Sequence, residues 1–536
     1  MNVPGAGGAT SGQAPARGGP LYAGIDLGTS AVKVLVLDAA GMVIGRGEAS
    51  YPVDRPRPGW AEQDPGAWWA ATGVACRAAI AGLDPRRVAA VGVTGQMHGT
   101  VLLDAAGRPV RPAIIWMDQR STAEVAEITA TVGRDRLIGI TGSPLVTGFQ
   151  AASVAWCRRH DPHTWDRVRR IALPKDALRL RMTGEWRTDA SDASGTLLLD
   201  VLERDWSETL LAAAGIDRET LPPVGPSTAG AGTLRSEAAA LLGLPAGTPV
   251  VAGAGDAPAA ALGAGVVGPD TLFLTISTGS QVLVPAPEPR IDPAGRLHTF
   301  CAAPGPDEAA GWYVMGASLA AGLAMHWLRD QVFALGGPDA LDRMTAWAQE
   351  VPAGANGLLF VPYLLGERTP HMDSEARGTL LGLTAAHGRG DLVRAVMEGV
   401  VFATRDASLA LTETGAAPER IVVAGGGSRS PLWLQMIADI HGRPVTPLAT
   451  ADQSAVGAAL LAAAGTGGHS LVDLARSWPV LDQTVQPDED RHRRYAELFP
   501  IYRSMYAKHR EDFAALGRMH RDGAGEIASE PGPGVA

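Results

Sequence analysis

The chain has 536 residues, of which 46% are hydrophobic and 19% charged, and its 46 Lys and Arg against 56 Asp and Glu give a formal net charge of −10. At roughly 150 residues per domain this length predicts two to four domains, and the apolar content excludes a chain that is disordered throughout. The surplus of carboxylates repels phosphate backbones and acidic lipids, which argues against nucleic-acid and membrane-surface partners.

The apolar residues are too scattered for a membrane span. No uninterrupted apolar stretch approaches the roughly 18 residues that a span needs, and the first 20 residues lack the apolar core of a signal peptide. The three cysteines, Cys76, Cys157 and Cys301, are widely spaced and make neither a disulfide framework nor a metal knuckle. We therefore expect a protein of the reducing cytoplasm.

The two ends of the chain differ from its middle. Residues 1–19 and the stretch after residue 510, most clearly from about 520 to 536, are predicted to be mostly disordered tails, because Gly, Pro, Ala and Ser dominate there without periodicity. Between them, β-branched runs alternate with Ala-rich helical stretches, which predicts an α/β fold.

None of the lysines Lys33, Lys175 and Lys508 follows a glycine. A nucleotide-binding P-loop is therefore excluded.

Residues 21–38 and 271–288 have the same pattern, an apolar strand, a Gly/Ser/Thr turn and a second apolar strand. This similarity favours duplicated domains that each open with a β-hairpin, although a chance likeness of two hairpins is the alternative. In the first hairpin Asp26 ends the strand and Gly28, Thr29 and Ser30 form the turn, whose N–H groups suit phosphate oxygens. Because Asp26 would repel phosphate without a divalent cation, the pattern predicts Mg²⁺-nucleotide; an ordinary hairpin is the other interpretation.

The segment TGQMHG (94–99) follows an apolar strand predicted at 88–93. Its polar groups emerge at the strand end, where α/β proteins bind ligands. Gln, His and a backbone-exposing Gly suit a polyol, whose hydroxyls need donors and acceptors. A single His such as His98 is more often a structural histidine, so both interpretations stay open here.

A second acidic residue, Asp256, lies where the buried strand of VVAGAGD (250–256) turns into a helix. There it serves either as a rigid carboxylate at the floor of a cleft or as the N-cap of the helix. The GxGxxG pattern at 263–268 follows a helical run rather than a strand, so we interpret it as a helix end and loop and not as a dinucleotide site.

The segment VVAGGGSRSPLW (422–433) combines a strand, three glycines and a helix capped by Ser428 or Ser430. Gly425, Gly426 and Gly427 would let a flat or anionic ligand lie against a helix N-terminus. Alone, a Gly-rich turn from a strand to a helix is usually an ordinary turn without a ligand.

Taken together, these segments resemble the FGGY carbohydrate kinases from about residue 22 to about residue 505, and are most similar to the members that phosphorylate xylulose. The matching segments are GIDLGTSAVK (24–33), GWAEQDPGAWW (59–69), TGQMHG (94–99), LPKDALRLRMTGE (173–185), SDASGT (191–196), GAGDA (253–257), VPYLLGERTPH (361–371), GTLLGLTAAHGRGDLVRAVME (378–398) and AGGGSRS (424–430).

The resemblance implies two actin-like (ribonuclease H-like) ATPase domains flanking a deep central cleft. Residues 20–252 would bind the sugar and carry the first phosphate loop, and residues 253–510 would carry the catalytic base and bind adenine. Asp256 matches the base, which also contacts the substrate, and Asp26 matches the carboxylate that engages Mg²⁺ through water. The other matches are Met97 and His98 for sugar contacts, Gly28, Thr29 and Ser30 for the first phosphate loop, Thr278 and Gly279 for the second, and Gly425, Gly426 and Gly427 for the adenosine pocket.

The expected activity is ATP- and Mg²⁺-dependent phosphorylation of a pentulose, D-xylulose to D-xylulose 5-phosphate. The expected partners are the small-molecule sugar and ATP, and a homodimer is the one assembly considered. Two departures from the family pattern stand out. Ala152 and Ser153 replace a Pro-Lys pair, and Ala257 replaces the Asn that usually follows the base in xylulose-specific members, which leaves the ketose open. The alternatives are ribulose, a hexulose or glycerol as substrate, or a non-catalytic sugar or nucleotide sensor, against which the acidic residue at 256 argues.

Overall fold

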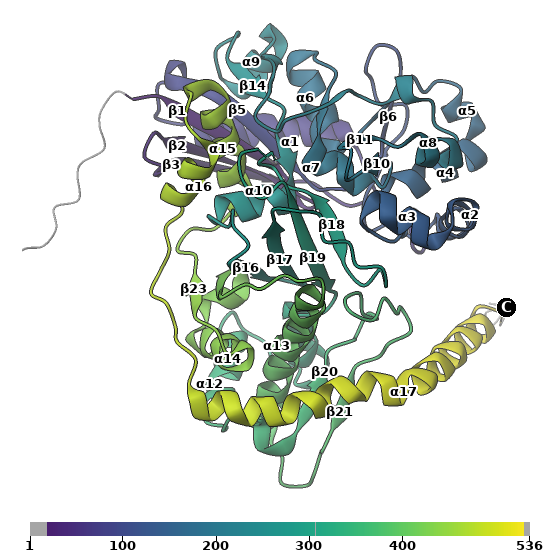
Figure 1. Cartoon of the computed structure of the whole chain (residues 1–536), viewed down its shortest axis with the longest axis vertical. Helices are drawn as coiled ribbons and strands as arrows, with labels where there is room; N and C mark the ends of the chain where they lie inside the picture. Colours follow the sequence, from purple (N-terminus) through teal and green to yellow (C-terminus); the bar gives the residue numbers. More distant parts are fainter. Residues whose placement is uncertain (1–18, 306, 530–536) are drawn as a thin grey trace, which may run out of the picture.

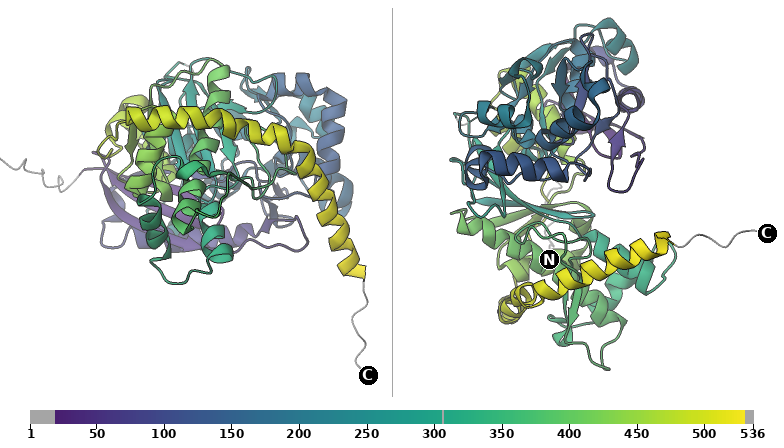
Figure 2. Two further views of the ribbon diagram at one scale, coloured as in Figure 1. Left: turned by 90° about the horizontal axis from the view of Figure 1, so that it is seen from below. Right: turned by 90° about the vertical axis from the view of Figure 1, so that its right-hand side faces the viewer.

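Two mixed β-sheets, each covered by helices, form the upper and lower lobes of the computed structural model in Figure 1, which describes residues 19–305 and 307–529. The second view in Figure 2 separates the same two lobes. The predicted α/β class is thereby confirmed. The tail predicted at 1–19 lies almost wholly outside the described residues, as do residues 530–536.

The first sheet has the strand order β13-β14-β5-β1-β2-β3, with the short β15 also paired to β5. Its strands are β1 (Leu21–Leu27), β2 (Ala31–Asp38), β3 (Val43–Ser50), β5 (Val88–Gly95), β13 (Gly230–Thr233), β14 (Pro249–Val251) and β15 (Ala254–Gly255). The first sheet therefore continues to Gly255, slightly beyond the boundary expected at residue 252, because β15 still pairs with β5.

The second sheet has the order β18-β19-β17-β16-β22-β23. Its strands are β16 (Thr271–Ile276), β17 (Ser280–Ala286), β18 (His298–Cys301), β19 (Trp312–Ser318), β22 (Arg420–Ala424) and β23 (Val445–Pro447). Both hairpins predicted from sequence, 21–38 and 271–288, are present as antiparallel pairs.

The two sheets share one arrangement of five strands. In the first, β1, β2 and β3 form an antiparallel meander, and β5 and then β14 continue the sheet parallel to β1. In the second, β16, β17 and β19 form the meander, and β22 and then β23 run parallel to β16. This repeated order is that of two actin-like domains and confirms the predicted duplication.

The helices cover these sheets or fill the loops between strands. They are α1 (Pro65–Ala79), α2 (Thr122–Val132), α3 (Arg134–Thr141), α4 (Gln150–His160), α5 (Pro162–Trp165), α6 (Pro174–Thr183), α7 (Ala190–Ala193), α8 (Glu208–Ala214), α9 (Ser236–Leu242), α10 (Asp256–Gly263), α11 (Gly322–Trp327), α12 (Ala340–Gln349), α13 (Arg389–Glu413), α14 (Pro431–His441), α15 (Gln453–Gly467), α16 (Leu471–Ser477) and α17 (Glu489–Ser529). Short strand pairs join the loops, namely β4 (Glu62–Gln63) with β7 (Ala113–Ile114), β6 (Val101–Leu103) with β8 (Arg170–Ala172), β9 (Thr188–Asp189) with β12 (Val224–Gly225), β10 (Leu199–Asp200) with β11 (Asp205–Trp206), and β20 (Leu359–Val361) with β21 (Thr379–Leu381).

Helix α15 lies on the first sheet, although its sequence falls in the half of the chain expected to form the second domain (Figure 1). Two glycines allow this contact. A Cβ atom on Gly24 of β1 would lie 1.9 Å from the carbonyl oxygen of Ala455, and one on Gly92 of β5 would lie 1.9 Å from that of Ala458. Only glycine lets the backbones approach so closely.

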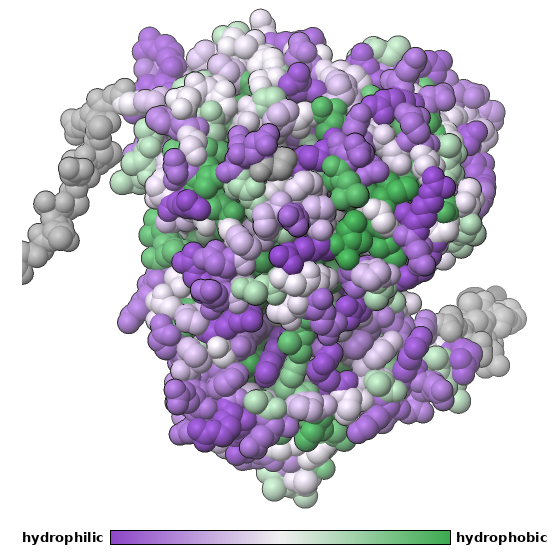
Figure 3. All heavy atoms as spheres, in the orientation of Figure 1, coloured by the Kyte–Doolittle hydropathy of each residue, from purple (hydrophilic) through white to green (hydrophobic). Residues whose placement is uncertain are grey.

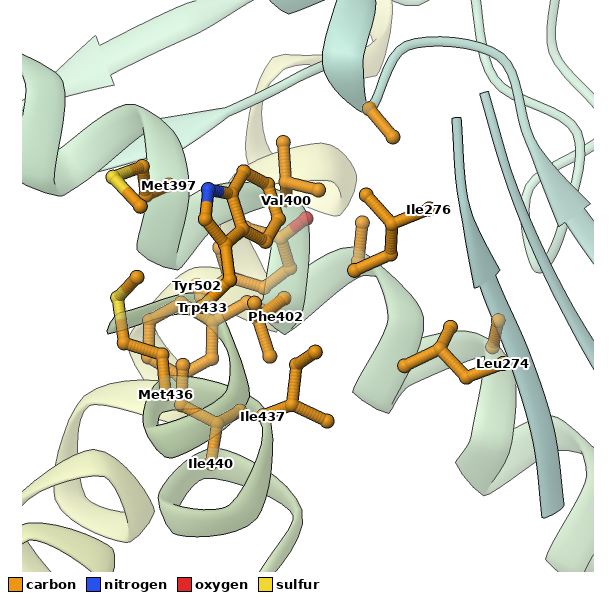
Figure 4. Close-up of a cluster of buried hydrophobic side chains, with 14 of the residues drawn as sticks. Leu274, Ile276, Met397, Val400, Phe402, Trp433, Met436, Ile437, Ile440 and Tyr502 are labelled. Atoms are coloured by element: carbon orange, nitrogen blue, oxygen red, sulfur yellow. The ribbon is translucent and has the colours of Figure 1, made fainter. Parts of the chain in front are cut away.

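The core of the second domain forms where β16, α13, α14 and α17 meet. Figure 4 shows their side chains pointing toward one another, and the rings of Phe402 and Tyr502 pack in a tilted arrangement with 5.2 Å between their centroids. Both rings are almost completely buried. Such burial fixes α13 and α14, which flank the glycine turn after β22.

The C-terminal tail expected from residue 511 is helical up to Ser529, so that prediction was wrong for most of its length. Helix α17 runs along the outside of the second domain (Figures 1 and 2). Its residues Tyr495, Phe499, Tyr502 and Phe513 are buried and recur on one face of the helix. The packing of this apolar face extends the helix past residue 510.

On the face drawn in Figure 3, hydrophilic residues cover most of the surface and hydrophobic residues gather in smaller groups. Among the described residues, none of the helices combines the length and apolarity that crossing a membrane requires.

Candidate active site

The first glycine turn joins β1 to β2, and surrounding side chains hold its oxygen atoms. Gln63 Nε2 donates to the carbonyl oxygen of Thr29 at 2.6 Å, Trp116 Nε1 donates to Thr29 Oγ1 at 2.9 Å, and the Tyr51 hydroxyl donates to the carbonyl oxygen of Gly28. Within the described part of the chain, the N–H groups of Thr29 and Ser30 have no hydrogen bond. They are available to an anion.

Asp26 lies just before this turn, in register with Thr94 of β5. Its Oδ1 atom is buried and has no hydrogen-bond partner among the described residues. Burial, followed by the charge of Asp256, raises the pKa of Asp26 to about 7, while Lys33 opposes the shift. Lys33 itself is paired with Asp452 at 2.7 Å.

An orphaned carboxylate oxygen of this kind fits a divalent cation. The described residues contain no group of three or more His, Cys, Asp or Glu side chains that could enclose a metal ion. This donor set suits Mg²⁺, which proteins commonly hold through one or two carboxylates, water and substrate phosphates rather than in a protein cage.

Asp256 is the first residue of α10, and Gly255 is the N-cap. The interpretation of Asp256 as the N-cap of this helix is therefore wrong. Its Oδ1 atom accepts a hydrogen bond from the N–H of the next residue, Ala257, at 2.8 Å. Burial raises the pKa of Asp256 to about 6, against the lowering effect of backbone hydrogen bonds. The carboxyl group is thus set to change protonation near neutral pH.

A cavity of about 200 Å³ opens in front of Asp256, between the two domains. It is lined by Asp256, Ala257 and Ala260 of α10, Phe273, Thr275, Ser277 and Gln281 of the second hairpin, Ala424 and Gly425 after β22, and Gln453 and Ser454 of α15. The N-termini of α10 and α15 therefore meet at this cavity, and their dipoles favour negative charge there. Ser454 Oγ donates to the carbonyl oxygen of Asp256 at 3.3 Å, which ties the two helices together.

The second glycine turn, Thr278-Gly279, joins β16 to β17 in the position that Gly28 to Ser30 occupy in the first sheet. The Thr278 carbonyl accepts hydrogen bonds from the N–H groups of Ala321 and Leu323, at 2.9 and 3.0 Å. A Cβ atom on Gly279 would lie 2.5 Å from the carbonyl oxygen of Ser318, so the close approach of β19 requires glycine.

The triple-glycine segment follows β22 and lies against the end of β16. Gly425 has φ of 91°, and a Cβ atom there would lie 2.4 Å from the carbonyl oxygen of Ile276. Gly426 and Gly427 continue as a 3₁₀ turn, after which Ser430 caps α14 by accepting from the N–H of Trp433. Of the two caps considered from sequence, Ser430 is the one used.

Met97 and His98 lie on the first-domain side of Asp256. The carbonyl of Gly195 accepts a hydrogen bond from His98 Nδ1 at 2.7 Å, so Nδ1 carries the proton and Nε2 is an acceptor. Burial and the charge of Arg368 lower the pKa of His98 to about 4, which keeps it neutral. Met97 is buried beneath Gly255, where a Cβ atom would lie 2.8 Å from Met97 Cγ.

An ionic cluster lies behind Asp256 that sequence reasoning did not single out. Lys175 is fully buried and pairs with Asp176 at 2.7 Å and with Asp189 at 2.9 Å. Asp189 accepts from the hydroxyl of Ser191, which in turn accepts from the N–H of Gly255 at 3.3 Å. The cluster thereby anchors the backbone from which Asp256 projects.

Trp116 and Arg368 were also missed. Trp116 holds Thr29, yet nothing in its sequence neighbourhood points to a phosphate loop. Arg368 belongs to the segment VPYLLGERTPH. This segment matched the family pattern, but no function was predicted for any of its residues from the sequence.

Two duplicated domains, a glycine turn in each, and a buried carboxylate at a cavity between them define a two-domain phosphotransferase of the actin-like class. The FGGY family of carbohydrate kinases matches the chain with its N-terminal domain at residues 21–263 and its C-terminal domain at residues 272–466. The chain belongs to the FGGY family of carbohydrate kinases.

Individual proteins similar to this chain support the family assignment. Xylulose kinase of Escherichia coli (strain K12) is 39% identical over 488 residues, covering 91% of this chain and 98% of that protein. Xylulose kinase of Bacillus subtilis (strain 168) is 35% identical over 502 residues, covering 93% and 99%. The crystal structure of xylulose kinase from Rhodospirillum rubrum superimposes with a TM-score of 0.85 at 32% identity, covering 92% of this chain and all of that one.

Proposed function

We propose that this protein transfers the γ-phosphoryl group of ATP to the 5-hydroxyl of D-xylulose, giving D-xylulose 5-phosphate. The observation that carries the proposal is the position of Asp256, a buried carboxylate at the start of α10 that faces the cavity between the two domains. The relatives named above, which act on xylulose by their names, support this sugar over the other polyols considered.

In this proposal Asp256 is the general base. It accepts the proton of the 5-hydroxyl as that oxygen attacks the γ-phosphorus. A pKa raised to about 6 leaves most of the group ionised at neutral pH and still basic enough to take the proton. The N-termini of α10 and α15 favour the negative charge of the phosphoryl group at the cavity.

Asp26 would hold Mg²⁺, through water, beside the nucleotide. The metal, when bound, neutralises phosphate charge. The free N–H groups of Thr29 and Ser30 and the Thr278-Gly279 turn would hold phosphate oxygens from either side. Once Asp26 faces a cation, its repulsion toward the incoming phosphates is removed.

Met97 and His98 would contact the sugar, and His98 Nε2 would accept a hydrogen bond from one of its hydroxyls. Gly425, Gly426 and Gly427 would carry the adenosine, whose flat base needs a surface free of side chains. As part of the same proposal we assign the enzyme to the cytoplasm, in keeping with three buried, unpaired cysteines, and propose a homodimer as its assembly.

A coupled assay of ADP release tests the proposal, with D-xylulose, D-ribulose, gluconate and glycerol as acceptors. We expect the highest kcat/KM with D-xylulose. ADP release with another acceptor alone would move the assignment to that sugar. ATP and sugar binding without any turnover would support the sensor interpretation, and light scattering of the same sample gives the oligomeric state.

A further inference from the structure

Arg368 differs from three other arginines whose side chains lie in the interior of the protein. Arg120 is paired with Asp118 at 2.7 Å, Arg179 with Asp176 at 2.9 Å, and Arg394 with Glu398 at 2.6 Å. The Arg368 guanidinium, which is only partly exposed, forms no hydrogen bond and no ion pair with any described residue. Because a guanidinium stays charged and needs acceptors, such a group is suited to a ligand.

The backbone of Arg368 is held rigidly beside the second glycine turn. Glu367 accepts from the hydroxyl of Ser318 at 2.6 Å and from the N–H of Arg368 at 2.7 Å, so its carboxylate is already engaged. Thr369 bonds to Ala317 through its N–H and its hydroxyl, at 3.0 and 3.2 Å. Residues 367–369 are therefore fixed to the end of β19, and the Arg368 side chain projects from the second domain.

This side chain reaches residues of the first domain. Its Cζ atom lies 5.9 Å from the centre of the Trp116 ring, whose Nε1 holds Thr29. Its charge also acts on His98 and His298, whose pKa values are lowered to about 4 and about 3 mainly by burial. Arg368 thus lies beside the expected sugar contact, between the two domains.

The chemistry of the reacting sugar restricts what such a donor can bind. A 2-ketopentose closes its five-membered ring through the oxygen on C5. The proposed reaction uses that oxygen as the nucleophile, so the reacting molecule must be open, with a free carbonyl at C2. Among the oxygens of the open sugar the carbonyl alone is purely an acceptor, which matches a guanidinium that is purely a donor.

We propose that Arg368 binds the C2 carbonyl oxygen of the open-chain ketose and thereby sets the preference for a ketose over an alditol. This inference rests on the proposed function. It makes Arg368 a specificity-determining residue at the far end of the sugar from Asp256. A site built to hydrogen-bond one substrate group rejects the analogue that lacks it.

The test compares D-xylulose with xylitol, which has a hydroxyl in place of the carbonyl, by titration calorimetry. Arg368→Met should weaken D-xylulose binding about 10- to 150-fold, the range expected for losing a hydrogen bond to a charged group. Xylitol binding should change by less than about threefold, so the preference of the parent for D-xylulose should disappear. Arg368→Lys keeps the positive charge and should lose less D-xylulose affinity than Arg368→Met. It replaces Arg368→Met in the test if the Met variant does not fold.

Arg389→Met is the matched control, because Arg389 also lies over a tryptophan, Trp347, but at the start of α13. It should leave both affinities unchanged. Equal losses for both sugars in Arg368→Met would show a merely structural role, and a raised KM for ATP with unchanged sugar binding would place the guanidinium on the nucleotide; either result overturns the inference. A parent that fails to phosphorylate D-xylulose overturns the proposed function as well, and the ADP-release assay distinguishes that case.

Discussion

Asp26 and Asp256 flank the same strand from opposite sides. Asp26 on β1 pairs in register with Thr94 of β5, and Ala254 on β15, two residues before Asp256, pairs with Thr94 from the other side. The negative charge of Asp256 in turn raises the pKa of Asp26. Two carboxylates are thus held near each other at the carboxyl end of one strand, the edge of an α/β sheet where ligands bind.

Replacing Asp256 by Asn should reduce kcat by roughly 100-fold or more while leaving sugar and ATP binding near normal, because only the proton acceptor is lost. The Asn oxygen can still accept from the N–H of Ala257. Turnover assays and calorimetry on the same sample measure both effects. Asp270→Asn, at an exposed ion pair with Arg420, is the control. Undiminished turnover in folded Asp256→Asn would remove Asp256 from the mechanism.

The pH profile should carry the signature of this base. Below its pKa of about 6 the carboxyl of Asp256 is protonated and cannot accept a proton, so kcat/KM should rise with pH through that value. A second rise near pH 7, from Asp26, should shift to lower pH as Mg²⁺ is increased, because the cation favours the ionised carboxylate. Profiles of kcat/KM against pH at two Mg²⁺ concentrations separate the two rises. If the rise near pH 6 persisted in Asp256→Asn, it could not come from Asp256, and the assignment of Asp256 as the base would be contradicted.

Replacing Asp26 by Ala should weaken the use of Mg²⁺-nucleotide and spare sugar affinity, since the orphaned Oδ1 is the atom that faces the cation. The measurement is the Mg²⁺ concentration for half-maximal rate, with D-xylulose affinity from calorimetry. The opposite pattern, lost xylulose affinity with unchanged Mg²⁺ dependence, would assign Asp26 to the sugar.

Replacing Ala257 by Asn should sharpen the choice of ketose. Ala257 lines the cavity beside Asp256, and an amide there can add a hydrogen bond of about 0.5–1.5 kcal/mol to a sugar hydroxyl. The kcat/KM ratio of D-xylulose over D-ribulose should therefore rise about 2- to 13-fold. A lower ratio would mean that the pocket is built for a different pattern of hydroxyls.

Close packing on the first sheet predicts an effect on stability. Gly24→Ala places a Cβ atom 1.9 Å from the backbone oxygen of Ala455, so α15 must move, and we expect a loss of about 1–3 kcal/mol in the free energy of unfolding. Gly139→Ala is the control, because it lies within α3 with nothing within 4 Å of the added Cβ. It should stabilise by about 0.5–1 kcal/mol. Denaturant unfolding of both variants measures these changes in the free energy of unfolding. Equal stability of Gly24→Ala and the parent would contradict the close packing of α15 on β1.

Local patterns predicted the parts of this molecule that local chemistry determines. Both hairpins, the strand before Met97 and the glycine turn before Ser430 follow from residues adjacent in sequence. The packing of α15 on the first sheet does not follow from adjacent residues. Gly24 and Ala455 are far apart in the chain, and no pattern near either residue predicts their contact. For the same reason the unpaired state of Arg368 and the burial of Lys175 emerge only when distant segments are packed together.

The placement of α15 also constrains how the chain folds as it is synthesised. The strands of the first sheet are complete by Gly255, but the helix that buries one face of β1 and β5 begins only at Gln453. While the intervening residues are being translated, that apolar face has no permanent cover. The first domain therefore matures late, together with the second, and a fragment ending near residue 270 should be far more sensitive to protease than the same residues within the whole chain.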